Sequence, residues 1–184
     1  MKITNLSKSF NNVDIFKNAS FEFENGKITY IMGKSGIGKT TLLKIIAGLD
    51  KIYTGIIDKV EKLAYVFQEP RLFPSLTIKE NVKIVNPNSK YSIKDVLDIV
   101  ELSDYENMYP NELSGGMKAR VSIARAIFYD ADVVLMDEPF ASIDENMKNR
   151  IAPKIFKELK NKTVIVVSHD LSEAKIYSDK IISI

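Results

Sequence analysis

A short glycine-rich segment has the residue types and spacing of a phosphate-binding loop. Residues 33–40, GKSGIGKT, have a glycine, four further residues, and then glycine, lysine and threonine. Backbone N–H groups can converge on an anion in such a loop, and a helix that starts there adds positive partial charge. Lys39 can reach the β and γ phosphates, while the Thr40 hydroxyl is a hard oxygen ligand for Mg²⁺. The segment therefore predicts a site for a nucleoside triphosphate with Mg²⁺.

The neighbouring sequence favours this interpretation over a chance glycine-rich turn. The apolar run ITYIM precedes the loop, and TTLLKII, with apolar residues at helical spacing, follows it. A strand that passes through the loop into a helix is the context that gives the pattern its meaning. The predicted nucleotide-binding residues of this segment are Gly33, Lys34, Ser35, Gly36, Ile37, Gly38, Lys39, Thr40 and Thr41.

Two adjacent carboxylates follow a buried apolar strand later in the chain. In ADVVLMDEP, Asp137 and Glu138 come directly after the apolar run VVLM. Open α/β sheets bind their ligands at the carboxyl ends of strands. Asp137 is suited to hold Mg²⁺ through its water shell, and Glu138 is suited to take a proton from the water that attacks the γ phosphate. Considered alone, the pair leaves open that DEP is only a solvated strand end.

Hydrophobic periodicity indicates the elements that position these residues. Strands are expected at KITNL, SFEF, ITYIMG, ADVVLMDE, TVIVVSHD and KIISI. Helices are expected at TTLLKIIAGL with Leu49 on its apolar face, after the caps Ser92 and Ser114, at NMKNRIAPKIFKEL with an interruption at Pro153, and at LSEAKIYS. Buried strands that alternate with helices predict an α/β fold with a mainly parallel sheet, a β-rich front and a helical insertion.

Length and composition limit the class of protein. The 184 residues, 45% hydrophobic and 27% charged, suit one compact domain. A formal net charge of +2 is too near balance to favour a nucleic-acid partner. The absence of cysteine removes disulfides, thiolate zinc sites and a cysteine nucleophile. No apolar run approaches the ~20 residues of a membrane span, and the start lacks the apolar core of a signal peptide, so we expect any membrane role to go through a partner.

One further segment, LSGGMKAR at residues 113–120, makes a family resemblance specific. With the loop at 33–40 and the acidic pair, the chain resembles an ABC transporter ATP-binding domain over essentially its whole length, and LSGGMKAR resembles the signature of that family. Ser114, Gly115 and Gly116 offer a hydroxyl and backbone donors at a helix start, a second anion-binding end. The resemblance implies a head-to-tail dimer in which these residues close on ATP held by the other subunit.

Four more residues acquire roles through the same resemblance. Gln68, in YVFQEPRLFP, matches the Q-loop glutamine, which contacts Mg²⁺ or the attacking water; alone it would be a surface residue. His169, the only histidine, matches the switch histidine that contacts the γ phosphate, although a lone histidine is more often a satisfied core residue. Asp144 matches the D-loop, a dimer contact, and by itself looks like a helix cap. Phe10 matches the aromatic that stacks on adenine, with an ordinary core or edge phenylalanine as the alternative.

The resemblance implies a P-loop NTPase fold of the ABC type over residues 1–184, with a mainly parallel sheet core and an antiparallel β front. It implies one ATP-binding domain with a helical subdomain at about 75–129. It implies an ATPase that uses ATP and Mg²⁺ to move a small solute through separate transmembrane permease subunits, with import favoured over export. The implied partners are a second copy or a homologous ATPase subunit, the permease, and an extracellular solute-binding protein reached through the permease. The implied location is peripheral, at the cytoplasmic face of the cell membrane.

Departures from the commoner family pattern carry some information. Met117 replaces the Gln that often follows the signature glycines, and Lys34 stands where Pro is frequent; neither change removes a catalytic group. Met117, with QEPRLFP and MDEPFASID, resembles the importer branch that handles nitrate, sulfonates and taurine. The chain stops at Ile184, just after the last predicted strand, so we expect no control by an appended regulatory domain.

Two other functions compete with a transport ATPase. An ABC ATPase of DNA repair or ribosome-associated type would usually carry a long coiled-coil insertion or two cassettes, and a small-molecule P-loop kinase would need an arginine-rich lid and would leave the signature unexplained. The loop after Gln68 contains Leu72 and Phe73 between prolines, and we expect both side chains to be exposed for the permease. The alternative is that both fold inward and pin the helical insertion to the core.

Overall fold

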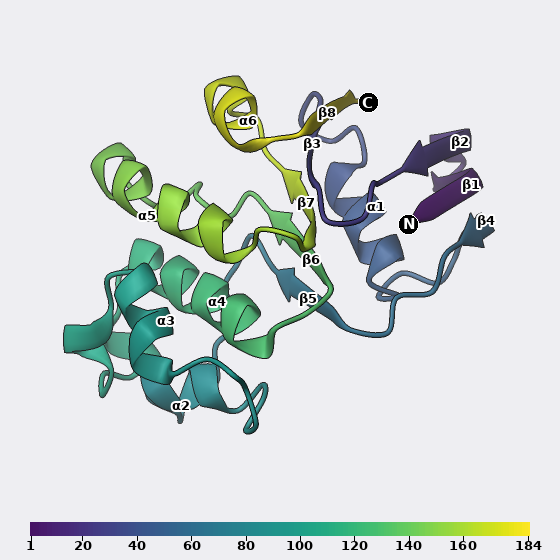
Figure 1. Ribbon diagram of the computed structural model, residues 1–184. Coiled ribbons are helices and arrows are strands. Elements are labelled where there is room, and N and C mark those ends of the chain that lie inside the picture. The colour runs from purple at the N-terminus through teal and green to yellow at the C-terminus, as the bar shows by residue number, and fades with distance from the viewer.

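A five-stranded parallel sheet crosses the middle of the molecule, in the strand order β5-β6-β7-β3-β8 (Figure 1). A separate antiparallel sheet of three strands, in the order β2-β1-β4, lies beside it. The computed structural model describes residues 1–184. The strands are β1 (Lys2–Phe10), β2 (Val13–Glu22), β3 (Ile28–Met32), β4 (Thr54–Ile57), β5 (Leu63–Val66), β6 (Val133–Asp137), β7 (Thr163–Val167) and β8 (Lys180–Ser183). The predicted parallel core with an antiparallel front is confirmed.

Helices cover both faces of the parallel sheet and form a group of their own at one end. The α-helices are α1 (Lys39–Ile46), α2 (Ile78–Lys83), α3 (Ile93–Ile99), α4 (Gly115–Tyr129), α5 (Glu145–Glu158) and α6 (Leu171–Tyr177), with short 3₁₀ turns η1 (Ser103–Tyr105) and η2 (Pro110–Glu112). Helices α2, α3 and α4 gather at the end of the molecule remote from the antiparallel sheet (Figure 1). None of the helices has the length and apolar character that crossing a membrane requires.

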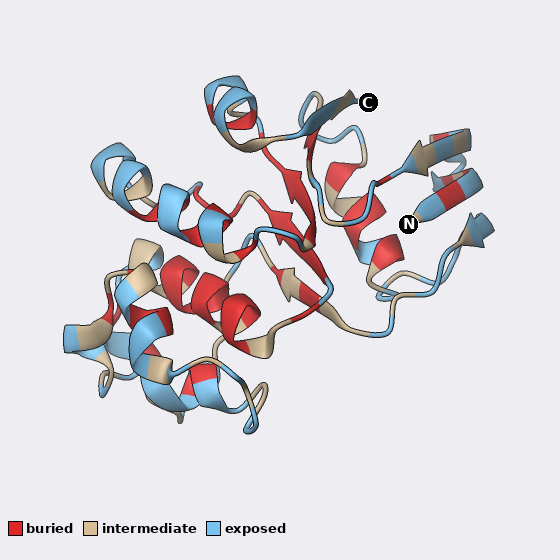
Figure 2. Cartoon of the chain, in the orientation of Figure 1, coloured by how far each residue is buried: buried red, intermediate tan, exposed pale blue.

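Alternate side chains of the central strands divide between two hydrophobic cores. On β6, Val134 and Met136 join the larger core, which contains residues of α4 and α5, while Val133 and Leu135 join the smaller core, which contains residues of α1 and the antiparallel sheet. Side chains alternate between the two faces of a strand, so this division means that both faces of the sheet are covered. The central strands are accordingly buried along their length (Figure 2).

Polar side chains determine where the middle helices begin. The Ser92 and Ser114 side chains accept backbone N–H groups at the starts of α3 and α4, as predicted. Thr77 and Glu80 form a capping box at the start of α2. The apolar residues expected on α3, at its C-terminal end and on α4 pack inward: Val96, Leu97, Val100, Val121, Ile123 and Ala124 are all buried.

The prediction that the first helix includes Leu49 is wrong. Helix α1 ends at Ile46, and Leu49 is 57% exposed. Gly48 has φ of 68°, and the N–H of Leu49 donates to the carbonyl of Lys44 at 2.9 Å. This is the glycine-terminated hydrogen-bond pattern that closes helices, so the chain turns away before Leu49 can pack.

The prediction that Pro153 interrupts its helix is also wrong. Helix α5 runs without a break from Glu145 to Glu158. Proline cannot donate to the carbonyl of residue 149, which costs a helix most when that carbonyl is buried. Both Pro153 and Asn149 lie on the exposed side of α5, where water can satisfy the free carbonyl. Strands β4 and β5, the latter at the edge of the parallel sheet, were not among the predicted elements.

Candidate active site

A cleft of about 290 Å³ lies at the carboxyl ends of the parallel strands. Its walls come from the glycine-rich loop after β3, from the ends of β6 and β7, from the loop after β5 and from the β1–β2 hairpin. The lining residues are Phe10, Ile15, Ser35, Gly36, Gly38, Lys39, Thr40, Thr41, Gln68, Asp137, Glu138 and Val167. We call this space the main cleft. The sequence predicted ten of these twelve residues, and it also predicted Gly33, Lys34 and Ile37, which belong to the same loop but do not line the cleft.

The start of α1 is open toward a ligand. Gly38 occupies the capping position with φ of 112°, and no side chain accepts the N–H groups of the first turn. A Cβ at Gly38 would lie 2.4 Å from the Ile15 side chain, so this position requires glycine for space as well as for conformation. The Lys39 ammonium folds back over the loop and donates to the carbonyls of Gly33 and Lys34 at 2.7 and 3.0 Å. Free N–H groups, a helix start and a lysine together form an anion-binding cradle.

Hard oxygen atoms meet at one wall of the main cleft. The Thr40 hydroxyl donates to Asp137 Oδ1 at 3.0 Å, and the Tyr65 hydroxyl donates to Asp137 Oδ2 at 3.3 Å. Burial raises the pKa of Asp137, and the bonds from Thr40 and Tyr65 oppose that rise. Residues 1–184 hold no cluster of three or more His, Cys, Asp or Glu side chains that could bind a metal alone. One carboxylate, one hydroxyl and the amide of Gln68 nearby fit Mg²⁺, which shares its coordination with substrate phosphates and water.

Glu138 lies next to the only histidine of the chain. Glu138 Oε2 is 3.0 Å from His169 Nδ1. The Glu138 backbone has φ of 49°, in the left-handed region, and its N–H donates to the carbonyl of Val167 at 2.9 Å, which ties the end of β6 to β7. Such a backbone conformation is costly for a residue other than glycine and often marks functional sites. A second cavity of about 230 Å³, the switch cavity, adjoins the cleft, and Glu138 lines both while His169 lines only the switch cavity.

Phe10 lies at the rim of the main cleft, at the tip of the β1–β2 hairpin. It is 47% exposed, which excludes a core phenylalanine, whereas its place at the end of β1 agrees with the edge alternative as well as with a role in stacking. The Lys8 ammonium lies 4.4 Å from the ring centroid and is itself paired with Asp50 at 2.8 Å. An exposed aromatic face at the edge of an anion-binding cleft is available for a base to stack on it.

The glycine pair at residues 115–116 lies outside this cleft. Neither Ser114 nor Gly115 nor Gly116 lines the main cleft or the switch cavity. Ser114 accepts the N–H of Met117 at 3.2 Å, and the Ser142 hydroxyl donates to the carbonyl of Gly115 at 3.4 Å. The predicted dimer-contact residue Asp144 caps α5 by accepting the N–H of Met147, as its interpretation as a helix cap requires. The predicted second anion-binding end therefore lies apart from both cavities that Glu138 lines.

A family model described as ABC transporter matches residues 16–141. The chain belongs to the ABC transporter family. A curated relative, the aliphatic sulfonates import ATP-binding protein SsuB of Bacillus cereus, is 40% identical over 190 residues, which cover 96% of this chain and 76% of the relative. The resemblance inferred from the sequence motifs is confirmed, including the sulfonate-type branch.

Solved ABC cassettes have the same fold. The bacterial ABC transporter cassette MJ0796, solved as a dimer, superposes with a TM-score of 0.87 at 29% identity, and the match covers 100% of this chain and 93% of that chain. The same cassette has been solved as a dimer in a post-hydrolysis state with ADP and Pi, with equal TM-score, identity and coverage. The P-loop NTPase fold of the ABC type is confirmed.

The loop that follows Gln68 in this ABC cassette does not expose both of its large apolar side chains. Leu72 is partly buried and packs against the larger core, whereas Phe73 is 46% exposed. The expectation that both are exposed is therefore wrong for Leu72 and correct for Phe73. Asn81 holds the backbone at this point, because its side chain accepts the Phe73 N–H at 2.8 Å and donates to the Phe73 carbonyl at 3.1 Å.

An apolar groove of about 320 Å³ lies between β5, this loop and α4. Its lining is mainly hydrophobic and aromatic: Leu63, Ala64, Tyr65, Phe67, Arg71, Val85, Ser122, Arg125, Ala126 and Tyr129. Arg71 stacks over Phe67 at 4.2 Å, and Arg125 lies 5.5 Å from the Phe73 ring. We call this space the apolar groove. It adjoins the cassette's main cleft through the segment from Tyr65 to Gln68.

Three side chains near the cassette's active site were not predicted from the sequence. Ile15 and Val167 line the main cleft, and Tyr65 donates to Asp137. Ile15 and Tyr65 lie on β2 and β5, for which no strand was predicted at those residues. The apolar alternation of KLAYVF was the available signal for β5.

Proposed function

We propose that this chain is the ATP-hydrolysing subunit of a bacterial ABC importer, bound peripherally at the cytoplasmic face of the membrane to separate permease subunits. The observation that carries the proposal is the main cleft, where an anion-binding loop, Asp137, Gln68 and Glu138 lie together with His169 adjacent to Glu138. The name of the relative from Bacillus cereus supports import. It also makes sulfonates the first solutes to test. An extracellular solute-binding protein would deliver the solute to the permease. Residues 1–184 would act as one ATP-binding domain with its helical subdomain at about 75–129.

The cleft residues divide the work of hydrolysis. The open start of α1 and Lys39 hold the phosphates, and the exposed Phe10 ring stacks on the base. Thr40, Asp137 and Gln68 would hold Mg²⁺, which when bound neutralises phosphate charge as it develops in the transition state. Glu138 accepts the proton of the attacking water, and His169 at 3.0 Å fixes the orientation of that carboxylate and contacts the γ phosphate.

The position of the signature supports a head-to-tail dimer. Ser114, Gly115 and Gly116 line neither the main cleft nor the switch cavity, although a helix start with free glycine N–H groups is suited to an anion. A second copy, or a homologous subunit, would supply the nucleotide that this end contacts. Asp144, at the start of α5, would lie at the same interface. ATP then joins two subunits that are separate without it.

Phosphate release and light scattering test this function directly. We expect the purified chain to release inorganic phosphate from ATP with no acceptor present, which a small-molecule kinase would not do. We expect Glu138→Gln to form a dimer with ATP and Mg²⁺ but not with ADP, and Ser114→Arg in that background to remain a monomer that still binds ATP. A monomer at high protein concentration with saturating ATP and Mg²⁺ would contradict the dimer.

The apolar groove is the proposed binding site for the permease. Phe73 is an exposed aromatic side chain beside the apolar groove, which adjoins the main cleft near Gln68. A short permease helix bound in this groove would move with Gln68 when ATP binds in the cleft. Phe73→Ser should keep the melting temperature and basal ATPase activity but lose copurification with the permease. Leu72→Ser is the matched comparison, because Leu72 packs against the core and its loss should lower the melting temperature. Retained copurification of Phe73→Ser would argue against this use of the groove.

A further inference from the structure

The loop that carries His169 is fixed by its neighbour Asp170. Asp170 Oδ1 accepts the N–H groups of Ser172 and Glu173 at 2.9 and 3.0 Å and thereby caps α6. The Asp170 N–H donates to the buried Ser168 hydroxyl at 3.0 Å. His169 lies between these two anchored residues, so its position depends on where Asp170 is held.

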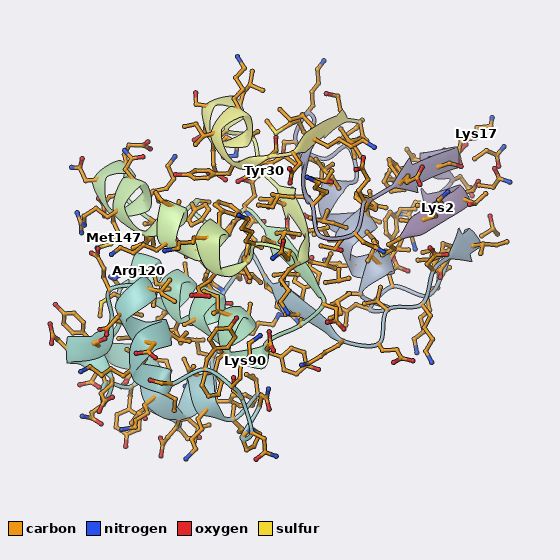
Figure 3. All side chains as sticks on the ribbon, in the orientation of Figure 1. Lys2, Lys17, Tyr30, Lys90, Arg120 and Met147 are labelled. Carbon is orange, nitrogen blue, oxygen red and sulfur yellow. The ribbon has the colours of Figure 1, made fainter.

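Helix α6 is joined to the sheet on one side. Tyr30, on β3, lies between the sheet and α6 (Figure 3), and its hydroxyl donates to Glu173 Oε1 at 2.8 Å. Both side chains are buried, and burial raises the pKa of Glu173. This contact fixes the helix after the loop but does not reach the loop itself.

Lys148, on α5, holds the loop from the other side. Its ammonium lies 2.8 Å from Asp170 Oδ2 and 3.0 Å from Glu145 Oε2, and its side chain is only 12% exposed. Burial lowers the pKa of Lys148, but the hydrogen bonds to Asp170 and Glu145 raise it above the ordinary value of lysine. The two partners are unequal, because the Glu145 side chain is largely exposed and an exposed ion pair contributes little.

Lys148 lies near three residues with proposed roles in the active site: Glu138, His169 and Asp144. It lines the switch cavity together with Glu138 and His169. It also lies one turn after Asp144, whose carboxylate caps the same helix. A charged group that is mostly buried needs its partner, so the Lys148–Asp170 contact is expected to persist and to transmit the position of α5 to the histidine loop.

We propose that Lys148 is a positioning residue for hydrolysis: through Asp170 it holds His169 against Glu138 and couples that contact to the start of α5. The inference deepens the proposed ATPase and rests on the roles given there to His169 and Glu138. The ion pairs of Lys148 are with Asp170 and Glu145, not with His169 or Glu138. Without Lys148, Asp170 would keep its cap on α6 but lose its link to α5, so we expect the position of His169 to loosen while the nucleotide-binding residues stay in place.

Steady-state kinetics of the full chain separate positioning from folding. Lys148→Met should lower kcat by about tenfold or more with little change in KM for ATP, since displaced catalytic groups lose turnover rather than ground-state binding. Lys148→Arg should recover most of the activity. Lys157→Met is the matched control, an exposed lysine of the same helix outside the switch cavity, and should behave as the unchanged protein. A lower melting temperature with unchanged kcat would show that the ion pair only stabilises the fold and would overturn the proposal.

The single histidine allows its position to be observed directly. Because the chain contains one histidine, the imidazole gives one set of NMR signals. Lys148→Met should shift or broaden these signals, and Lys157→Met should not. If Lys148→Met does not fold, Asp170→Asn replaces it, because the amide keeps the Oδ1 acceptor that caps α6 while it loses the charge facing Lys148. Unchanged imidazole signals in the folded variant would overturn the proposal.

A double-mutant comparison distinguishes this inference from the function on which it rests. If Lys148 acts through His169, then Lys148→Met should cause no further loss of kcat in a His169→Ala background. Normal hydrolysis by His169→Ala alone would refute the role of His169 in the proposed function. Slow hydrolysis by His169→Ala with normal hydrolysis by Lys148→Met would refute only the role of Lys148. If Lys148→Met in the Glu138→Gln background no longer dimerises with ATP, the lysine serves the interface instead, which also overturns the proposal.

Discussion

Two helix starts in this molecule are built from glycine-rich sequence, yet they differ in how their N–H groups are used. At the start of α1, Gly38 has a left-handed backbone, and no side chain caps the helix. At the start of α4, Ser114 has an extended backbone, and its hydroxyl accepts the N–H of Met117. The first start lines the main cleft of its own chain, and the second does not.

The two helix starts differ in how their free backbone N–H groups are satisfied within a single chain. A helix start with unsatisfied donors is stable where a ligand or water reaches it, and the main cleft provides that access for α1. Helix α4 begins beside Ser142, which lies in the loop between β6 and α5, and its own Ser114 satisfies one donor. The chain thus contains one complete phosphate cradle and one that we propose waits for a second subunit. The predictions below test this division.

The general base for hydrolysis should be Glu138, which lines the main cleft together with the start of α1. We expect Glu138→Gln to slow phosphate release by about 10²- to 10⁴-fold, the usual range for loss of a general base. ATP binding should persist, because the start of α1 and Lys39 are unchanged. Nucleotide binding by filter retention and phosphate release by colorimetry measure the two effects. Near-normal turnover would remove Glu138 from its role.

The open start of α1 should tolerate no side chain at its capping position. Gly38→Ala places a Cβ 2.4 Å from Ile15 at φ of 112°, so the loop must move and ATP hydrolysis should fall on the order of 100-fold. Gly48→Ala is the control, since Gly48 also has a positive φ but no atom within 4 Å of its added Cβ and lies outside the cleft. It should lose some stability and keep kcat. Equal losses of kcat in both variants would mean that the backbone conformation, rather than the cleft, is responsible.

Ser114, at the capped start of α4, should contribute both to the stability of the fold and to dimerisation with ATP. Ser114→Ala and Ser92→Ala each remove a helix cap, and each should reduce the free energy of unfolding by about 1 kcal/mol. Only Ser114→Ala should also weaken ATP-driven dimerisation, measured by light scattering in the Glu138→Gln background. The same dimer affinity in both variants would show that Ser114 does no more than cap its helix.

The smallest expected effect comes from Glu173, at the start of α6, and concerns only the stability of the fold. Burial raises the pKa of Glu173 in the folded chain, and the bond from Tyr30 opposes that rise. A carboxyl with a raised folded pKa favours the fold when protonated, and this contribution is lost as the pH rises through the folded value. Glu173→Gln cannot ionise, so its melting temperature should exceed that of the unchanged chain at about pH 8 and approach it toward about pH 4. A difference that is constant with pH would contradict this account.

The amino-acid sequence by itself determined the parts of the site that are contiguous. The loop at 33–40 needs only a strand before it and a helix after it, and both can be recognised from local apolar spacing. Asp137 ends β6 after four apolar residues and Glu138 follows it, so their place at a strand end is also local information. The signature became recognisable because Ser114 and its glycines are adjacent in the chain.

The tertiary structure alone decided which of these segments meet. Strand β3 pairs with β7 and β8, and β6 with β5 and β7, so residues far apart in the chain line one cleft because of the sheet order. That order depends on long-range packing of two cores, which no local pattern specifies. The same holds for Leu72 and Phe73, neighbours of similar character of which one packs inward and one does not. Lys148 gave no signal in sequence, because a lysine on a helix acquires meaning only from the carboxylate that the fold places opposite it.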